Sequence, residues 1–185
     1  MTLARYPQRF GGEGTIVSLA DGRAFTAAHC LAAADGRAGS IVVGAAGQQW
    51  RVVRRWSPRG RDLAWLEVAG PIRQPRSTRR PEGLAAPGTL APGVEVVFHA
   101  HTGRRFVHRT AVVVAVSATR AVAEVRSRAG VADGDSGGPV LVGGRLAGIV
   151  IARLGVPRSS RASSRLVLTR LDLHGFCKKS TPSAF

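Results

Sequence analysis

Three side chains in this sequence have the types needed for nucleophilic hydrolysis. Ser136 lies in the glycine-rich run GVADGDSGGPV, His29 in FTAAHC and Asp62 in RDLAWLEV. A serine hydroxyl attacks a carbonyl at neutral pH only when a base takes its proton, and histidine suits this role because its pKa is near 7. The base in turn needs a carboxylate that fixes its tautomer and stabilises the imidazolium. The sequence therefore predicts Ser136 as nucleophile, His29 as general base and Asp62 as orienting acid.

The segments TAAHC, DLAWLEV and GDSGGPV resemble the three signature segments of trypsin-like (chymotrypsin-fold) serine proteases, and they occur in the same order along the chain. The resemblance covers roughly residues 11–175. It implies an all-β fold of two packed six-stranded antiparallel barrels, with His29 and Asp62 on the first and Ser136 on the second. It also implies an oxyanion hole made by the backbone N–H groups of Gly134 and Ser136, and a reaction that needs no cofactor or metal.

The rest of the sequence agrees with an all-β architecture. Short runs rich in β-branched residues recur between Gly, Pro, Asp and Ser, which is typical of a barrel or sandwich. We expect an N-terminal extension at 1–10, a first barrel at 11–75, a linker at 76–91, a second barrel at 92–176 and a tail at 177–185. The string LTRLDLHGF at 168–176 predicts a short C-terminal helical turn.

Proline and glycine are frequent in residues 70–93, so we expect an exposed connector between the two barrels. Arginine is crowded into this stretch, at Arg73, Arg76, Arg79 and Arg80. Two interpretations remain open: a solvated charged linker, or a docking patch for an acidic partner protein.

The net charge of +16 is the unusual feature of the composition, and only two of the 27 basic residues are lysine. Such a field attracts polyanions and acidic proteins. Aromatic residues make up only 5% and do not alternate with the arginines, so we do not expect nucleic acid to be the functional ligand. No apolar run reaches the ~18–20 residues that a membrane span needs. MTLARYPQRF has no apolar core typical of a secretion signal, so we expect a cytoplasmic protein.

Two further features separate the sequence from secreted members of the family. The cysteine that normally bridges to the position of Cys30 is absent, so we expect Cys30 to be a buried thiol outside any disulfide, as suits a reducing compartment. In activated family members the acid before the nucleophile, here Asp135, binds an N-terminal amine made by cleavage. The sequence has no IVGG-like start at the right distance before His29. We therefore expect an arginine or backbone amides to bind Asp135, without a zymogen switch.

Substrate preference is predicted from the positions that the resemblance assigns to the primary specificity pocket. Gly130, six residues before the nucleophile, offers no countercharge for Lys or Arg at the P1 position. Leu166 stands where a glycine commonly keeps the pocket open, so we expect small or medium P1 residues. Ile151 and Arg153 follow the wall strand, and an inward Arg153 would instead favour acidic P1 residues. Asp133 would line the pocket if Lys or Arg were preferred after all.

Other classes of function remain in view. The fold could serve as a binding module with weak or latent catalysis that recruits an acidic partner through its charge. A basic nucleic-acid-binding protein is a further alternative. Three histidines near one strand, His99, His101 and His108, are expected to be ordinary strand residues and not metal ligands.

Overall fold

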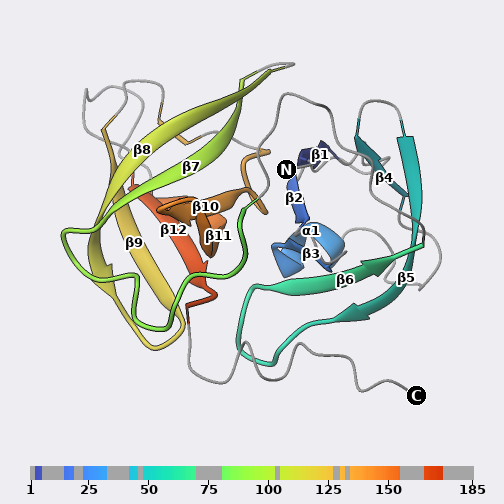
Figure 1. The fold of residues 1–185 in the computed structure, drawn as a ribbon, viewed down its shortest axis with the longest axis horizontal. Helices are drawn as coiled ribbons and strands as arrows, with labels where there is room; N and C mark the ends of the chain where they lie inside the picture. Colours follow the sequence, from blue (N-terminus) through green and yellow to red (C-terminus); the bar gives the residue numbers. More distant parts are fainter. Residues whose placement is uncertain are drawn as a thin grey trace.

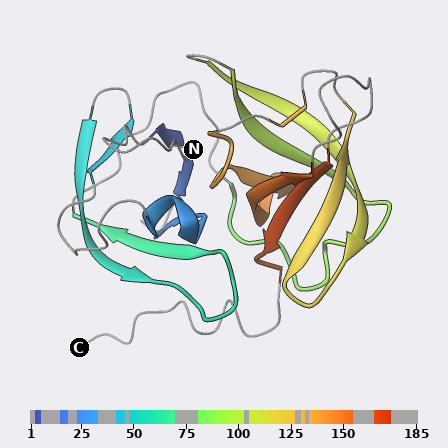
Figure 2. The same cartoon turned by 180° about the vertical axis from the view of Figure 1, so that it is seen from behind.

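The computed structural model describes residues 3–5, 15–18, 23–32, 42–45, 48–69, 81–102, 105–126, 130–131, 134–154 and 165–172. Its strands form two closed antiparallel barrels of six strands each. The barrels lie side by side, with the first barrel at the right of Figure 1 and the second at the left. Figure 2 shows the same arrangement from behind. The expected all-β, two-barrel fold is confirmed.

The first barrel has the strand order β1-β2-β3-β6-β5-β4. Its strands are β1 (Leu3–Arg5), β2 (Thr15–Ser18), β3 (Arg23–Thr26), β4 (Val42–Ala45), β5 (Gln48–Trp56) and β6 (Ala64–Val68). A five-residue helix, α1 (Ala28–Ala32), follows β3 directly. Because β1 pairs with both β2 and β4, the barrel begins at Leu3 and not at residue 11 as expected. A three-residue strand carries too little alternation to be recognised in the sequence.

The second barrel has the strand order β10-β11-β12-β9-β8-β7. Its strands are β7 (Glu95–Thr102), β8 (Arg105–Val116), β9 (Arg120–Val125), β10 (Pro139–Val142), β11 (Arg145–Leu154) and β12 (Arg165–Arg170). β12 continues to Arg170, so the expected C-terminal helical turn does not include residues 168–170. The remainder of that turn, from residue 173 onward, lies outside the described residues.

Apolar side chains from both barrels meet in a shared cluster. Val17, Phe25 and Leu63 come from the first barrel, and Leu146, Ile149 and Leu171 from the second. All six are fully buried. This contact explains why β11 is buried without interruption from Leu146 to Ile151: one face of the strand fills its own barrel and the other faces the first barrel. The hydrophobic effect therefore holds the two barrels against each other.

The second half of the connector is exposed only in part, because three of its side chains are buried. Pro81, Ala85 and Leu90 are buried, and Leu84 forms a parallel bridge with Leu146 of β11. The Ala85 N–H donates to the Leu146 carbonyl at 2.9 Å. Residues 81–93 therefore belong to the second barrel. The four connector arginines lie outside the described residues.

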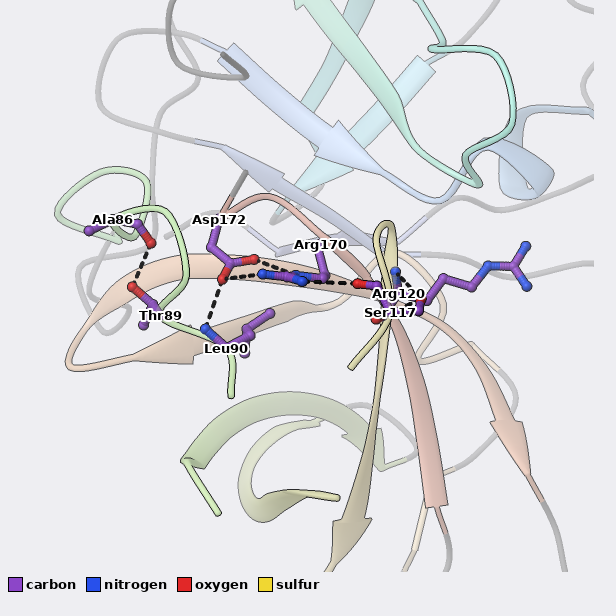
Figure 3. A network of polar contacts seen from close by, with 7 residues as sticks. All are labelled: Ala86, Thr89, Leu90, Ser117, Arg120, Arg170 and Asp172. Carbon is purple, nitrogen blue, oxygen red and sulfur yellow. Dashed lines mark hydrogen bonds and ion pairs between the residues drawn. The ribbon is translucent and has the colours of Figure 1, made fainter. Parts of the chain in front are cut away.

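An ion pair fixes this segment to the end of β12 (Figure 3). Arg170 donates from Nε and Nη2 to the two carboxylate oxygens of Asp172, at 2.9 and 3.0 Å. The same carboxylate accepts a bond from the Leu90 N–H at 2.8 Å, and the Asp172 carbonyl accepts one from the Gly88 N–H at 3.0 Å. Arg170 also donates to the Ser117 carbonyl at 2.9 Å. The Arg170–Asp172 pair thus joins the connector, the end of β12 and the β8–β9 turn.

The one helix among the described residues, α1, is neither long nor apolar enough to cross a membrane.

Candidate active site

His29 and Asp62 are joined by two hydrogen bonds on the first barrel. His29 sits in the first turn of α1, and Asp62 lies in the turn between β5 and β6. The ring atom Nδ1 of His29 lies 2.6 Å from Oδ2 of Asp62, and the His29 backbone N–H donates to Oδ1 at 2.9 Å. The carboxylate therefore holds the imidazole in one orientation with Nδ1 protonated, so that in the neutral form of the ring Nε2 is the proton acceptor.

The pair shifts both pKa values. The hydrogen bond to Asp62 raises the pKa of His29 to about 10, with a second contribution from Cys30 and an opposing effect of burial. Burial acts to raise the pKa of Asp62, but the hydrogen bonds from the His29 ring, the His29 backbone and the Ala28 backbone hold it below its usual value. The ionic form of the pair is thereby favoured across the neutral range.

Cys30 lies beside Nε2 of the His29 imidazole. Its Sγ atom is 3.6 Å from His29 Nε2 and 3.8 Å from the Ser136 carbonyl oxygen. The thiol is buried and outside any disulfide, as expected, and it packs with Ala27 and Ile151. Between the described residues, no hydrogen bond joins His29 Nε2 to the Ser136 hydroxyl; the thiol is the group that contacts Nε2.

Ser136 stands on a tight turn of the second barrel, directly before β10. The Gly137 N–H donates to the Val150 carbonyl at 2.7 Å, and the Gly138 N–H donates to the Asp135 carbonyl at 2.9 Å. Gly137 has a φ of 87°, a backbone conformation that glycine adopts without strain. Cys30 and the Ser136 carbonyl are in contact across the barrel interface, so the structure brings the Ser136 turn to the His29–Asp62 pair.

Gly134, two residues before Ser136, has a backbone conformation that favours glycine. Its φ is 94°, which a side chain would disfavour. Within the described part of the chain, neither the Gly134 N–H nor the Ser136 N–H donates a hydrogen bond to the protein. Both donors are therefore available for a negatively charged oxygen.

The structure brings together most of the residues expected in the specificity pocket. Arg153 lies opposite Leu166 in the β11–β12 ladder, and its guanidinium donates to the Val131 carbonyl at 3.3 Å. Leu166 is fully buried in the same apolar cluster as Val131. Gly130 is buried, and its backbone φ of 58° lies in the left-handed region. Ile151 instead packs toward Cys30, and Asp133 lies outside the described residues.

The structure describes only part of the surroundings of Asp135 and of the three histidines. Asp135, the residue before Ser136, is fully buried, and its binding to an arginine or to backbone amides stays a prediction. His99 and His108 stack across the β7–β8 pair, with ring centroids 4.1 Å apart. Burial, followed by the charge of His108, lowers the pKa of His99 to about 3, so His99 is neutral at physiological pH. The side chain of His101 lies outside the described residues.

The sequence did not predict three residues that are far from the site along the chain but are hydrogen-bonded to it or to each other. Thr15 of β2 bonds to the Gly134 and Ser136 carbonyls, and Thr26 of β3 bonds to the Thr15 carbonyl. Arg109 of β8 donates to the Gly130 carbonyl. The two threonines look in the sequence like ordinary β-strand residues, and Arg109 is one of many arginines. No local signal distinguishes them.

Comparison with known proteins places the chain in a family. Many solved structures share the fold. Among them are a serine protease of a human pathogenic astrovirus, 21% identical with a TM-score of 0.65, and an inactivated protease paralogue of the scabies mite, 16% identical with a TM-score of 0.75. The alignment covers 92% of this chain and 90% of the viral one, and 96% and 90% for the mite protein. No curated protein matches the sequence. The family model named Trypsin matches residues 14–171, and the chain therefore belongs to the trypsin family.

Proposed function

We propose that the protein is a serine endopeptidase that cleaves peptide bonds through an acyl-enzyme. The observation that carries the proposal is the double hydrogen bond between His29 and Asp62. A carboxylate in this position gives an imidazole the tautomer needed for accepting a proton at Nε2. The turn that presents Ser136 lies across the barrel interface from this nitrogen, on the far side of the Cys30 thiol.

In the proposed reaction, His29 Nε2 takes the proton of the Ser136 hydroxyl as its oxygen attacks the substrate carbonyl. The negative charge that develops on the carbonyl oxygen is stabilised by the N–H groups of Gly134 and Ser136. The imidazolium then gives its proton to the leaving amine, and the C–N bond breaks. Water, activated by the same imidazole, hydrolyses the ester and restores the Ser136 hydroxyl. Before attack, His29 Nε2 must exchange its contact with the Cys30 thiol for one with the Ser136 hydroxyl.

We expect the pocket to accept small or medium P1 side chains, namely Ala, Val, Thr or Leu. Leu166 and Val131 fill the region together, and no acid stands at Gly130 to neutralise Lys or Arg. An unpaired buried cation is costly, so basic P1 residues should be cleaved poorly. Acidic P1 residues are the alternative, because Arg153 lies at the same wall.

The proposed target is a protein inside the cell, cut at a limited number of sites. The reduced state of Cys30 suits a reducing compartment. The high positive charge would favour acidic proteins as partners or substrates.

A second candidate function is a binding module with the protease fold, in which catalysis is weak or latent. The observation in its favour is the contact of His29 Nε2 with the Cys30 thiol in place of the Ser136 hydroxyl. In this case the charge of the chain would recruit an acidic partner.

Labelling by a fluorophosphonate probe separates the two functions, since only an activated serine reacts quickly. We expect rapid labelling of the native chain and none in Ser136→Ala, with turnover in Ser136→Ala and His29→Ala reduced by several orders of magnitude. An unlabelled native chain that still binds acidic proteins would favour the binding module. A digest of a P1-varied peptide library, repeated with Arg153→Ala, then gives the cleavage preference and the role of Arg153 in it.

A further inference from the structure

The second barrel carries Ser136, but a residue of the first barrel holds the turn on which it stands. Thr15 lies in β2 and is 3% exposed. Its backbone N–H donates to the Ser136 carbonyl at 2.7 Å, and its hydroxyl donates to the Gly134 carbonyl at 3.0 Å. One residue therefore binds the carbonyls on both sides of Asp135.

Thr15 is itself held in place. Its carbonyl accepts a buried hydrogen bond of 2.7 Å from the Thr26 hydroxyl. A methyl group on Gly137 would collide with the Thr15 carbonyl oxygen and with the Thr26 hydroxyl. The backbone after the nucleophile therefore packs directly against Thr15, and this close contact leaves the turn little room to move.

These bonds fix three successive peptide units. The Gly134 carbonyl is bound by the Thr15 hydroxyl, the Asp135 carbonyl by the Gly138 N–H, and the Ser136 carbonyl by the Thr15 N–H. All peptides are trans, so each N–H points opposite to the carbonyl of its own peptide unit. The Ser136 N–H, one of the two proposed donors for the substrate oxyanion, belongs to the peptide unit of the Asp135 carbonyl, which the Gly138 N–H binds. Thr15 binds the peptide units immediately before and after this one.

Without the Thr15 hydroxyl, the peptide unit that follows Gly134 would be the most mobile of the three. A glycine at φ 94° has no side chain to restrict its backbone, so its peptide unit can rotate easily. Among the described residues, the Thr15 hydroxyl is the group that hydrogen-bonds to the Gly134 carbonyl, and it lies 119 residues away in the sequence. Preorganised donors stabilise a transition state only when they need not reorient during the reaction.

We propose that Thr15 is a positioning residue that preorganises the oxyanion-binding turn from the opposite barrel, through its side-chain hydroxyl. The inference rests on the proposed serine-protease function. It predicts that loss of the hydroxyl slows the chemical step without weakening substrate binding, and that it lowers stability by no more than the loss of one hydrogen bond.

The test compares Thr15→Val, which removes the hydroxyl at nearly constant shape, with Thr15→Ser, which retains it. Thr169→Val is the matched control, because Thr169 is also buried and its hydroxyl makes no hydrogen bond to any described residue. We expect Thr15→Val to slow fluorophosphonate labelling of Ser136 and kcat for p-nitrophenyl acetate by about five- to tenfold, the effect of one hydrogen bond. KM should stay within about twofold, while Thr15→Ser and Thr169→Val should resemble the native chain.

Amide hydrogen exchange provides a readout that does not need catalysis. Peptides covering residues 134–138 should exchange faster in Thr15→Val than in the native chain, Thr15→Ser or Thr169→Val. If the native chain fails to react with the probe, the proposed function fails and hydrogen exchange alone decides the role of Thr15. Unchanged labelling and exchange in Thr15→Val would overturn the inference. A Thr15→Val defect that appears in KM or in global unfolding, and that Thr15→Ser does not repair, would also overturn it.

Discussion

The Sγ atom of Cys30 lies 3.6 Å from Nε2 of His29, the ring nitrogen opposite the one bonded to Asp62. The imidazole is therefore held between a carboxylate on one side and a thiol on the other. Both contacts raise the pKa of His29, to about 10. A general base works only when deprotonated, so on the proposed function these contacts determine the pH at which His29 can accept a proton.

Replacement of the thiol should shift the pH dependence of the reaction. Cys30→Ala removes the second-largest influence that raises the pKa of His29, after Asp62. We expect the acidic limb of the profile of kcat/KM against pH to move to lower pH. Cys30→Ser, which keeps a group that can hydrogen-bond, should show a smaller shift. An identical acidic limb in all three proteins would exclude the contact as a cause.

The His29–Asp62 pair should make stability depend on pH in a defined window. The pKa of His29 is raised from 6.5 in the folded state, so its contribution is complete below pH 6.5 and is lost as the pH rises toward about 10. The pKa of Asp62 is lowered, so its contribution is present above its usual value of 3.8 and is lost in acid below that value. Urea unfolding at pH 5.5 and pH 10 should show a larger difference between the native chain and Asp62→Asn at pH 5.5. Because the His29 side chain is 47% exposed, solvent screening keeps this difference small. An equal difference at both pH values would contradict the assignment.

Gly137→Ala should damage both the fold and the site, and Gly93→Ala is its control. The two glycines share a φ of 87°, but nothing lies within 4 Å of a methyl group added at Gly93. Gly93→Ala should therefore lower the free energy of unfolding only by the strain of an alanine in the left-handed conformation, about 1–2 kcal/mol. Gly137→Ala adds a collision with the Thr15 backbone, so it should be less stable still and should lose Ser136 labelling. Equal effects of the two substitutions on unfolding and labelling would argue against the close contact.

Loss of the buried ion pair at the end of β12 should be costly. The Arg170 side chain is 11% exposed and that of Asp172 is fully buried, so Asp172→Asn leaves a nearly buried cation without its partner charge. We expect a loss of about 3–5 kcal/mol in the free energy of unfolding by urea. The matched control is Glu67→Gln, which breaks an exposed pair with Arg54 at 3.9 Å and should cost less than about 1 kcal/mol. Similar losses in the two variants would show that Asp172 has no special role.

The fold and the His29–Asp62 pair could be predicted because their signals are local. The segments around these residues and Ser136 are contiguous strings, and the glycines in the Ser136 turn indicate positive φ by their type alone. The role of Thr15 could not be predicted, because its partner Gly134 lies 119 residues away and a strand threonine carries no mark of a long-range bond. The contact of Cys30 with Nε2 depends on a side-chain orientation that the sequence does not encode locally.

The connector shows a different limit of sequence reasoning. Proline and glycine correctly indicated irregular backbone in residues 81–93, but irregular backbone need not be exposed. Backbone bonds to Leu146 and Asp172 satisfy the polar groups of this segment while Ala85 and Leu90 are buried.

The division of the site between two barrels has a consequence for the order of events during synthesis. Every strand of the first barrel lies between Leu3 and Val68, so this barrel can complete its hydrogen bonding while the second is still on the ribosome. His29 and Asp62 belong to this early unit. The nucleophile emerges later, and its turn acquires the bonds to Thr15 only when the second barrel docks. On the proposed function, the nascent chain therefore cannot complete its site before the second barrel has been synthesised and has docked on the first.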